Sequence, residues 1–295
     1  MRDGRRWTAT LRLLVTGAGG QLGTEIARLV DGDSKFDLIA LSSADLDVAD
    51  RRAVLAAVSA VAPDLIIHAA AWTAVDACES DPQWAFRVNA LGSRSVAEAA
   101  RRCGAHLVGL STDYVFDGTN PRPYNEWDTT NPLSVYGSSK LAGEREILAG
   151  CPGAAVVRTS WVCGAFGNNM VKTVLRLASG EGPLRFVDDQ IGCPTFTCDL
   201  APVLLRLGEE RMPGVVHVTN QGPTSWYQFA CDVLAAIGED PQRVQAISTD
   251  QLTPPRPAPR PRNSVLDNAT LRLYGWDLLA DHHDPLRRTL RELTS

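Results

Sequence analysis

One stretch near the amino end constrains the fold of this chain more than any other, because an apolar segment runs directly into a cluster of glycines. Residues 11–16 have the length of a buried strand, and Gly17, Gly20 and Gly23 follow at regular spacing. Apolar residues then recur at helical spacing over 21–31. Glycine permits a tight turn and a close approach of the backbone to a ligand, and the free amides of a helix start attract phosphate. The stretch therefore predicts the strand–turn–helix opening of a dinucleotide-binding unit.

Strand and helix patterns alternate through the first half of the chain. Strands are predicted at 11–16, 36–41, 65–68, 106–110 and 154–158, and helices at 21–31, 51–61, 83–102 and 135–149. Such alternation predicts a parallel sheet with helices on both faces. The expected fold class is α/β, with a Rossmann-like doubly wound parallel sheet and a smaller carboxyl-terminal α/β domain.

The second half of the chain is less regular and indicates a second domain. It contains one predicted strand at 215–218 and one predicted helix at 226–237. We expect an NAD(P)-binding Rossmann domain over residues 1–160 and a mainly substrate-binding domain over residues 161–295. In folds of this kind late segments often return to the first domain, and residues near 190–220 are the candidates here.

Tyr136 and Lys140 are four residues apart in a predicted helix and therefore share one face. The chain has 5 tyrosines and only three lysines, so chance rarely produces this spacing. An ammonium beside a phenol favours the phenolate and is expected to lower a pKa that is ordinarily about 10. We interpret the pair as a proton donor and acceptor that works near neutral pH. Taken alone, an ordinary exposed helix pair remains the alternative.

Composition excludes several classes of protein. The formal net charge of −5 does not favour a nucleic-acid surface. The chain has no apolar run of about 18 residues, so no membrane span is expected. Its 7 cysteines are scattered without a C-x-x-C pair, which indicates reduced thiols in the cytoplasm. Residues 1–9 are interpreted as a loose lead-in or a non-native start.

The histidines and arginines give weaker signals. The 5 histidines do not cluster with acids at metal-ligand spacing, so no metal ligands are predicted. His68 is expected to be structural, and His282 and His283 are expected at the solvated surface of a polar tail. Residues 253–262 alternate prolines with arginines and should form neither helix nor inner strand. This segment is either a linker or a source of arginines (Arg256, Arg260 and Arg262) that grip substrate phosphates.

Short motifs extend through nearly the whole chain. They are Gly20-Gln-Leu-Gly23, Ala69-Ala-Ala-Trp-Thr-Ala-Val-Asp76, Ser111-Thr-Asp-Tyr-Val-Phe116, Arg158-Thr-Ser-Trp-Val162, Gly167-Asn-Asn169, Asp189-Gln-Ile-Gly-Cys-Pro-Thr195 and Arg262-Asn-Ser264. Together with the glycine turn and the Tyr136–Lys140 pair, they make the chain similar to the extended short-chain dehydrogenase/reductase family. Within that family it resembles the subgroup that reduces 4-keto sugar nucleotides.

The resemblance implies NAD(P)H-dependent reduction of the C4 ketone of dTDP-4-dehydro-β-L-rhamnose to dTDP-β-L-rhamnose, the last step of dTDP-L-rhamnose biosynthesis. It implies three catalytic residues: Thr112 bonds the sugar carbonyl oxygen, Tyr136 donates the proton, and Lys140 binds the nicotinamide ribose and tunes Tyr136. The implied cofactor-binding residues are Gly17, Gly20, Gln21, Leu22, Gly23, Ser42, Asp47, Val48, Ala71, Trp72, Thr73, Tyr136 and Lys140. The implied substrate-binding residues, which would hold the sugar nucleotide, are Thr112, Asp113, Tyr136, Trp161, Asn169 and Arg262.

Two departures from the pattern of the relatives bear on cofactor and metal. Where relatives often carry an acid that binds the ribose 2′-hydroxyl, this chain has Ser42 followed by Ser43. Serines can bond a 2′-phosphate that an acid repels, so NADPH is expected, with NADH as the alternative. Some relatives hold Mg²⁺ through acids at a dimer contact, but the matching position here is Cys198. Magnesium is therefore not supported by matched ligands, and either a monomer or a homodimer fits the sequence.

Three rival functions fit the same family. A sugar-nucleotide dehydratase would need an acid after Asp113, where this chain has Tyr114. A 4-epimerase would retain its nicotinamide cofactor through the cycle, and other sugar-nucleotide reductases share the same motifs. A non-catalytic regulatory subunit of methionine adenosyltransferase is a rival from another class of protein, which the intact Thr112, Tyr136 and Lys140 do not favour.

Overall fold

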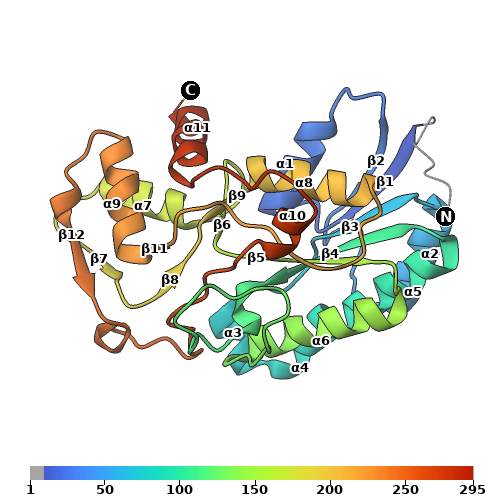
Figure 1. Cartoon of the computed structure of the whole chain (residues 1–295), viewed down its shortest axis with the longest axis horizontal. Helices are drawn as coiled ribbons and strands as arrows, with labels where there is room; N and C mark the ends of the chain where they lie inside the picture. Colours follow the sequence, from blue (N-terminus) through green and yellow to red (C-terminus); the bar gives the residue numbers. More distant parts are fainter. Residues whose placement is uncertain (1–9, 295) are drawn as a thin grey trace.

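Six parallel strands form the sheet at the centre of the larger part of the molecule (Figure 1). The computed structural model describes residues 10–294; residue 295 and the expected lead-in at 1–9 lie outside the described residues. In order across the sheet, the strands are β10 (Gly214–His217), β5 (Ala155–Thr159), β4 (His106–Thr112), β3 (Leu65–His68), β1 (Leu11–Thr16) and β2 (Phe36–Leu41). Every neighbouring pair is parallel, which confirms the predicted sheet.

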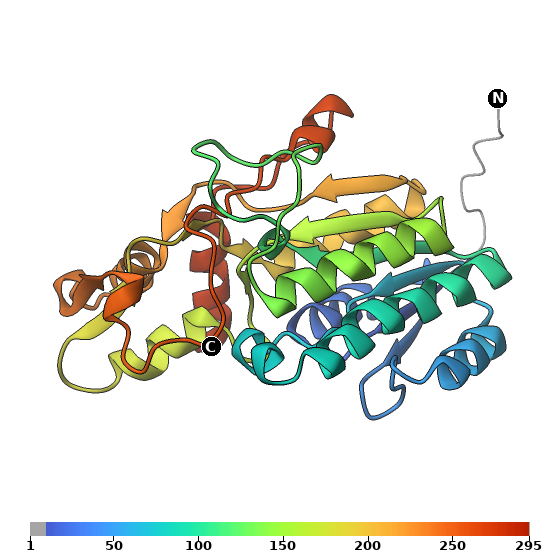
Figure 2. The same cartoon turned by 90° about the horizontal axis from the view of Figure 1, so that it is seen from below.

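Helices cover both faces of this sheet (Figure 2). One face packs against α1 (Gln21–Val30) and α8 (Thr197–Glu209), and the other against α2 (Arg51–Val61), α5 (Ser93–Cys103) and α6 (Val135–Gly150). Side chains alternate between the two cores along each strand, as in β1, where Leu13 and Val15 face α1 and α8 while Leu14 faces the opposite core. Within residues 10–294, no helix is both long and apolar enough to cross a membrane.

Side chains at helix starts explain where several helices begin. Asp50 accepts hydrogen bonds from two amides at the start of α2, and Ser134 accepts one from Gly137 at the start of α6. These bonds satisfy amides that would otherwise lack a partner in the first turn.

The single helix predicted at 83–102 is instead three consecutive helical segments. They are α4 (Pro82–Phe86), the π-helix η1 (Arg87–Gly92) and α5. The start lies one residue earlier than predicted, because Asp81 caps the Trp84 amide and Pro82 occupies the first turn. Hydrophobic periodicity does not distinguish a π-helical turn from an α-helical one, so the sequence pattern did not show the interruption.

A smaller lobe packs its own core from the second half of the chain. Its helices are α7 (Met170–Ala178), α9 (Trp226–Ala236) and α11 (His283–Thr294). Its short strand pairs are β7 (Leu184–Val187) with β12 (Val244–Ile247), β8 (Ile191–Gly192) with β11 (Thr224–Ser225), and β6 (Val162–Cys163) with β9 (Thr195–Phe196). Phe196 and Phe229 are fully buried at its centre. The remaining short elements are α3 (Val75–Ser80), η2 (Asp113–Val115), η3 (Pro241–Arg243), η4 (Thr249–Gln251) and α10 (Ala269–Leu273).

The chain passes between the two parts more than once. After β9 it returns as α8 and β10, and β10 forms the edge of the large sheet beside β5. Later, Leu271 of α10 joins the core beneath α1 and α8. Residues 253–262 contain neither helix nor strand, as their prolines predicted.

A buried ion pair joins β5 to α6. The Arg158 guanidinium makes two bonds to the Glu144 carboxylate, with Nη2 2.8 Å from Oε2 and Nε 2.9 Å from Oε1. The two side chains are only 6% and 4% exposed. Arg158 also lies over the Phe116 ring, 5.2 Å from its centroid. Removal of one partner would therefore leave an uncompensated charge in the core.

We predict that Arg158→Met lowers the free energy of unfolding by about 3–5 kcal/mol, because it leaves the buried Glu144 carboxylate without its ion-pair partner. Urea unfolding followed by circular dichroism measures the change. Glu210→Gln is the control, since it breaks the exposed pair between Glu210 and Arg206 and should cost less than about 1 kcal/mol. Equal effects of the two substitutions would contradict the prediction.

Candidate active site

A cavity of about 740 Å³ opens at the carboxyl ends of β1 and β3. β2 lies on one side of β1, whereas β3 and the strands that follow it lie on the other side. The direction in which strands are added therefore reverses between β1 and β3. Ligands of doubly wound sheets bind at such a switch point. The glycine turn after β1 and the segment after β3 both line the cavity.

Nearly all of the predicted cofactor-binding residues lie on the wall of this cavity. They are Gly17, Gly20, Gln21, Leu22, Gly23, Asp47, Val48, Ala71, Trp72, Thr73, Tyr136 and Lys140. Ser42 is not on the wall, and its hydroxyl donates to Asp45 Oδ2 at 2.6 Å. Its neighbour Ser43 lines the cavity instead.

The turn between β1 and α1 leaves room for a phosphate group. Gly17 has a φ of 74°, and a Cβ there would lie only 2.6 Å from the Ala70 amide nitrogen. No side chain caps the start of α1, where Gly20 is the N-cap residue. Amides at an uncapped helix start bind anions well. The backbone geometry and the size of the cavity thus fit a dinucleotide.

Tyr136 and Lys140 both reach the cavity, but the predicted effect of the lysine on the phenol was wrong. Burial raises the pKa of Tyr136 above its usual value, and a hydrogen bond with Thr112 offsets this only in part. Lys140 Nζ donates to the Leu110 carbonyl oxygen at 2.7 Å, and burial lowers its pKa to about 8. At Lys140, desolvation outweighs the attraction to the Glu144 carboxylate. Tyr136 therefore remains a neutral phenol at pH 7, which is the form that can donate a proton.

Thr112 and Asp113 follow one another at the end of β4. The Thr112 hydroxyl donates to Asp113 Oδ1 at 3.0 Å and accepts a bond from the Tyr114 amide at 3.2 Å. These bonds fix the Thr112 side chain beside Tyr136. Burial raises the pKa of Asp113 to about 7, despite the hydrogen bond from Thr112.

Of the other predicted substrate-binding residues, Trp161 and Asn169 make specific contacts with neighbouring side chains. The Trp161 ring stacks on Trp226 with centroids 3.5 Å apart, and its backbone has a φ of 45°. Asn169 Nδ2 donates to Gln21 Oε1 at 3.0 Å, which places it next to the cavity, and its Oδ1 accepts from the Lys172 amide at the start of α7. Asn169, at the start of α7 in the smaller lobe, thus contacts Gln21 of the cavity wall.

The arginines of residues 253–262 have different surroundings. The Arg260 guanidinium makes two bonds to Asp76, at 2.6 and 2.7 Å. This pairing favours a structural role for Arg260 over a phosphate contact. The predicted substrate contact Arg262 is exposed and does not line the cavity, although its carbonyl oxygen accepts a bond from Ile191.

Sequence reasoning missed Asn89, and it gave Thr159 no role although Thr159 lies in the motif over residues 158–162. Asn89, in η1, bonds both backbone groups of Trp72, at 2.8 and 3.1 Å, and donates to Ser139 Oγ at 2.9 Å. No pattern in the sequence distinguished it. Thr159 lines the cavity, and its buried Oγ1 has no hydrogen-bond partner among residues 10–294. Its position at the end of β5 was the available signal.

The histidine predictions had mixed outcomes. His68 is buried and bonded to Thr16 and Ser93, which confirms a structural role. The prediction of a solvated His282 was wrong, since only 2% of it is exposed. The prediction that histidines and acids do not cluster was also wrong, because folding brings Asp232 of α9 against His282 and His283. Residues so far apart in sequence give no spacing signal.

The chain matches the model of the family described as RmlD substrate binding domain over residues 11–295. It belongs to this family. A dTDP-4-dehydrorhamnose reductase of Streptomyces griseus is 44% identical over 274 residues, which cover 91% of this chain and 89% of that relative. This match confirms the resemblance that the motifs indicated.

Two solved structures are also similar to this chain. A dTDP-4-dehydrorhamnose reductase from Clostridium acetobutylicum has a TM-score of 0.93 and 40% identity, covering 97% of this chain and 100% of that one. Another from Bacillus anthracis, in complex with NADP, has a TM-score of 0.92 and 35% identity, covering 96% of this chain and 99% of that one. The expected α/β fold class is thereby confirmed.

Asp113 should make stability depend on pH. Its pKa is about 7 in the folded protein, whereas that of an unfolded aspartate is about 3.9. Between these values the folded state binds more protons, so its contribution to stability is full below pH 4 and is lost as pH rises to 7. We predict that Asp113→Asn flattens this decline. Urea unfolding of both proteins at several pH values measures it, and parallel pH curves would contradict the assignment.

Proposed function

We propose that this protein is an NAD(P)H-dependent reductase that converts dTDP-4-dehydro-β-L-rhamnose to dTDP-β-L-rhamnose, the last step of dTDP-L-rhamnose biosynthesis. One observation carries the proposal: Tyr136 and Lys140 both line a cavity that the glycine turn also lines. The chain around them is 44% identical to a named dTDP-4-dehydrorhamnose reductase. All 7 cysteines are free thiols, which supports a cytoplasmic location.

The glycine turn and the two segments beside it would hold the cofactor. The uncapped start of α1, with Gly20, Gln21 and Leu22, would bind the pyrophosphate. Asp47 and Val48 would flank the adenine, and the segment from Ala71 to Thr73 would line the rest. When bound, the nicotinamide would supply the hydride for the ketone, and these residues would hold it in place.

Tyr136 and Thr112 would act together at the C4 carbonyl oxygen. The Tyr136 hydroxyl would hydrogen-bond the oxygen as negative charge grows on it and would give it a proton, and Thr112 would turn its single hydroxyl hydrogen from Asp113 Oδ1 to the same oxygen. The raised pKa of Tyr136 keeps that proton in place until the oxygen becomes basic. The bond that Thr112 accepts from the Tyr114 amide can stay in place while the hydroxyl hydrogen turns to the substrate.

Lys140 would support the tyrosine after the proton has moved. Its ammonium has three donors, and the Leu110 carbonyl oxygen takes one. The others would bind the nicotinamide ribose. Its positive charge would also stabilise the phenolate that Tyr136 becomes, because attraction between charges is strong in a buried site.

The sugar nucleotide would lie between the large sheet and the smaller lobe. Asp113, Trp161, Asn169 and Arg262 remain our proposed contacts on that side. The best support concerns Trp161, whose positive φ is unusual for a bulky residue and is held by its stack on Trp226. Strain of this kind often positions a residue for a ligand.

Magnesium does not fit the residues near Cys198. Within residues 10–294, no group of three metal-ligating side chains includes Cys198, and magnesium prefers oxygen ligands. We therefore assign the metal no step in the reaction.

We predict that Tyr136→Phe lowers kcat by about 10²–10⁴-fold, because it removes the proton donor. Steady-state oxidation of NADPH with dTDP-4-dehydro-L-rhamnose measures the effect. Tyr274→Phe is the matched control, since Tyr274 is 61% exposed and should not change turnover. Normal turnover of Tyr136→Phe would remove Tyr136 from the mechanism.

The same preparation distinguishes the rival functions. A reductase should release its cofactor in each turnover and should be purified with little of it bound, whereas a 4-epimerase should retain it. A regulatory subunit should form a stable complex with methionine adenosyltransferase and oxidise no NADPH with any 4-keto sugar nucleotide. Either result would replace our proposal.

We also propose a preference for NADPH over NADH, supported by the NADP-bound relative and by Ser43 on the cavity wall. Ser43→Asp should lower kcat/KM for NADPH relative to NADH at least about 10-fold, because an acid repels a 2′-phosphate. Ser43→Asn, equal in size but uncharged, is the control. An unchanged preference in Ser43→Asp would place the 2′-phosphate elsewhere.

A further inference from the structure

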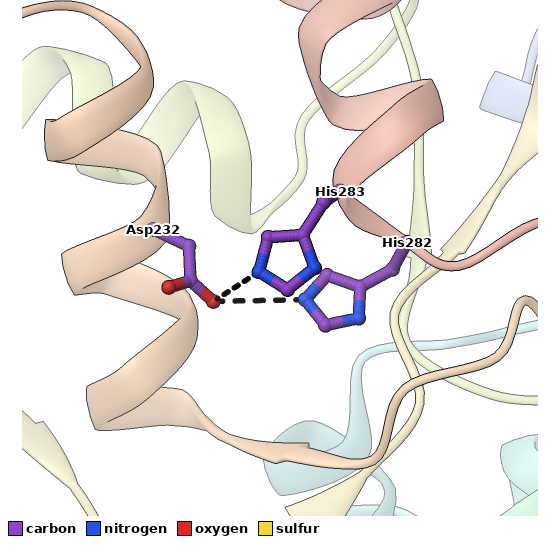
Figure 3. Close-up of side chains that lie close together, drawn as sticks. All are labelled: Asp232, His282 and His283. Carbon is purple, nitrogen blue, oxygen red and sulfur yellow. Dashed lines mark ion pairs between the residues drawn. The ribbon is translucent and has the colours of Figure 1, made fainter.

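Three side chains outside the cavity converge on one point between two helices of the smaller lobe (Figure 3). Asp232 projects from α9 toward His282 and His283, where α11 begins. Asp232 Oδ2 lies 3.6 Å from His282 Nε2 and 3.4 Å from His283 Nε2. All three atoms lie within 4.8 Å of one another.

The hydrogen bond at Nδ1 of each histidine ring determines the tautomer of that ring. His283 Nδ1 lies 2.6 Å from Asp281 Oδ1, and His282 Nδ1 lies 3.3 Å from the Gln221 carbonyl oxygen. Carboxylate and carbonyl oxygens only accept hydrogen bonds, so both Nδ1 atoms donate. In the neutral rings, each Nε2 therefore presents a lone pair toward Asp232.

Two of these atoms lack the partner that a buried polar atom needs. Among residues 10–294, neither His282 Nε2 nor Asp232 Oδ2 has a hydrogen-bond partner, although both are buried. His282 as a whole is only 2% exposed. Asp232 Oδ1, by contrast, accepts a bond from Gln228 at 2.9 Å. Buried polar atoms without a hydrogen-bond partner are rare. Two such atoms that lie 3.6 Å apart point to a bound ion that contacts both of them.

The spacing fits a metal ion of the zinc class. Zinc bonds to nitrogen and oxygen are about 2.0–2.1 Å long, so the ligand atoms of a tetrahedral site lie about 3.3–3.4 Å apart. The two distances from Asp232 Oδ2 are 3.4 and 3.6 Å. We propose that Asp232, His282 and His283 bind one divalent zinc-class ion.

The surroundings complete such a site. Metal-bound histidines typically donate their other nitrogen to a carboxylate or carbonyl, as both rings do here. The side chain of His283 is 48% exposed, which leaves water a path to the fourth position. None of the three ligands lines the cofactor cavity. The ion would instead clamp the start of α11 to α9 and stabilise the smaller lobe.

Titration of the full chain with zinc chloride tests the proposal. The protein is stripped with a chelator, any polyhistidine tag is removed, and isothermal titration calorimetry measures binding. We expect one ion per chain and, with Co²⁺ as a probe, the absorption of a tetrahedral nitrogen–oxygen site. His283→Gln and Asp232→Asn should weaken binding at least about 100-fold, because each removes a ligand.

The control is Asp284→Asn, which removes an exposed carboxylate that pairs with Arg287 at the same helix start. It should bind zinc as the unaltered protein does. Asp281→Asn should weaken binding about 10–100-fold, the usual effect of removing a carboxylate that orients a ligand. Zinc should raise the Tm of the unaltered protein and of Asp284→Asn, but not that of Asp232→Asn.

Two results would overturn the proposal. One is zinc binding that Asp232→Asn and His283→Gln leave unchanged, or no binding by the unaltered protein. The other is nitrogen NMR showing both Nε2 atoms protonated at pH 7 with zinc present, which would make the cluster an ion pair. Both substitutions are at incompletely buried side chains, and their circular dichroism spectra verify that the variants fold.

Discussion

The position of α6 against the backbone that follows β4 is the constraint on which the candidate site depends. A Cβ on Gly137 would lie only 2.2 Å from the Tyr114 carbonyl oxygen, so only glycine allows the helix this close. The contact sets the rotation of α6 and brings Tyr136 beside Thr112. Asn89 then ties the same helix to Trp72 through Ser139. The close approach at Gly137 and the hydrogen bonds of Asn89 thus place Tyr136 and the cavity wall together.

Burial gives Tyr136, the proposed proton donor, a pKa shift that its sequence neighbours do not predict. Removal from water raises the pKa of Tyr136 and lowers that of Lys140, so both groups move toward their neutral forms. The free enzyme therefore avoids a phenolate in its core. In the mechanism we propose, charge separates only during the reaction, when the Lys140 ammonium would stabilise the phenolate that Tyr136 becomes.

Local patterns predicted the parts of this molecule that depend on nearby residues. Apolar segments and glycines located the strands of the large sheet and the cavity beside them. Three features depended on contacts between distant segments and stayed hidden: the role of Asn89, the desolvation of Tyr136 and the meeting of Asp232 with His282. Periodicity carries no information about which residues from separate elements come together, or how deeply they are buried.

The return of the chain to add β10 has a consequence for engineering. Cutting at residue 160 would leave the edge of β5 without its partner and would remove α8 from the sheet it covers. The smaller lobe is thus not a cassette that can be exchanged in one piece. A chimaera that exchanges the smaller lobe would need two separate inserts, one on each side of α8 and β10, joined to an unbroken host sheet.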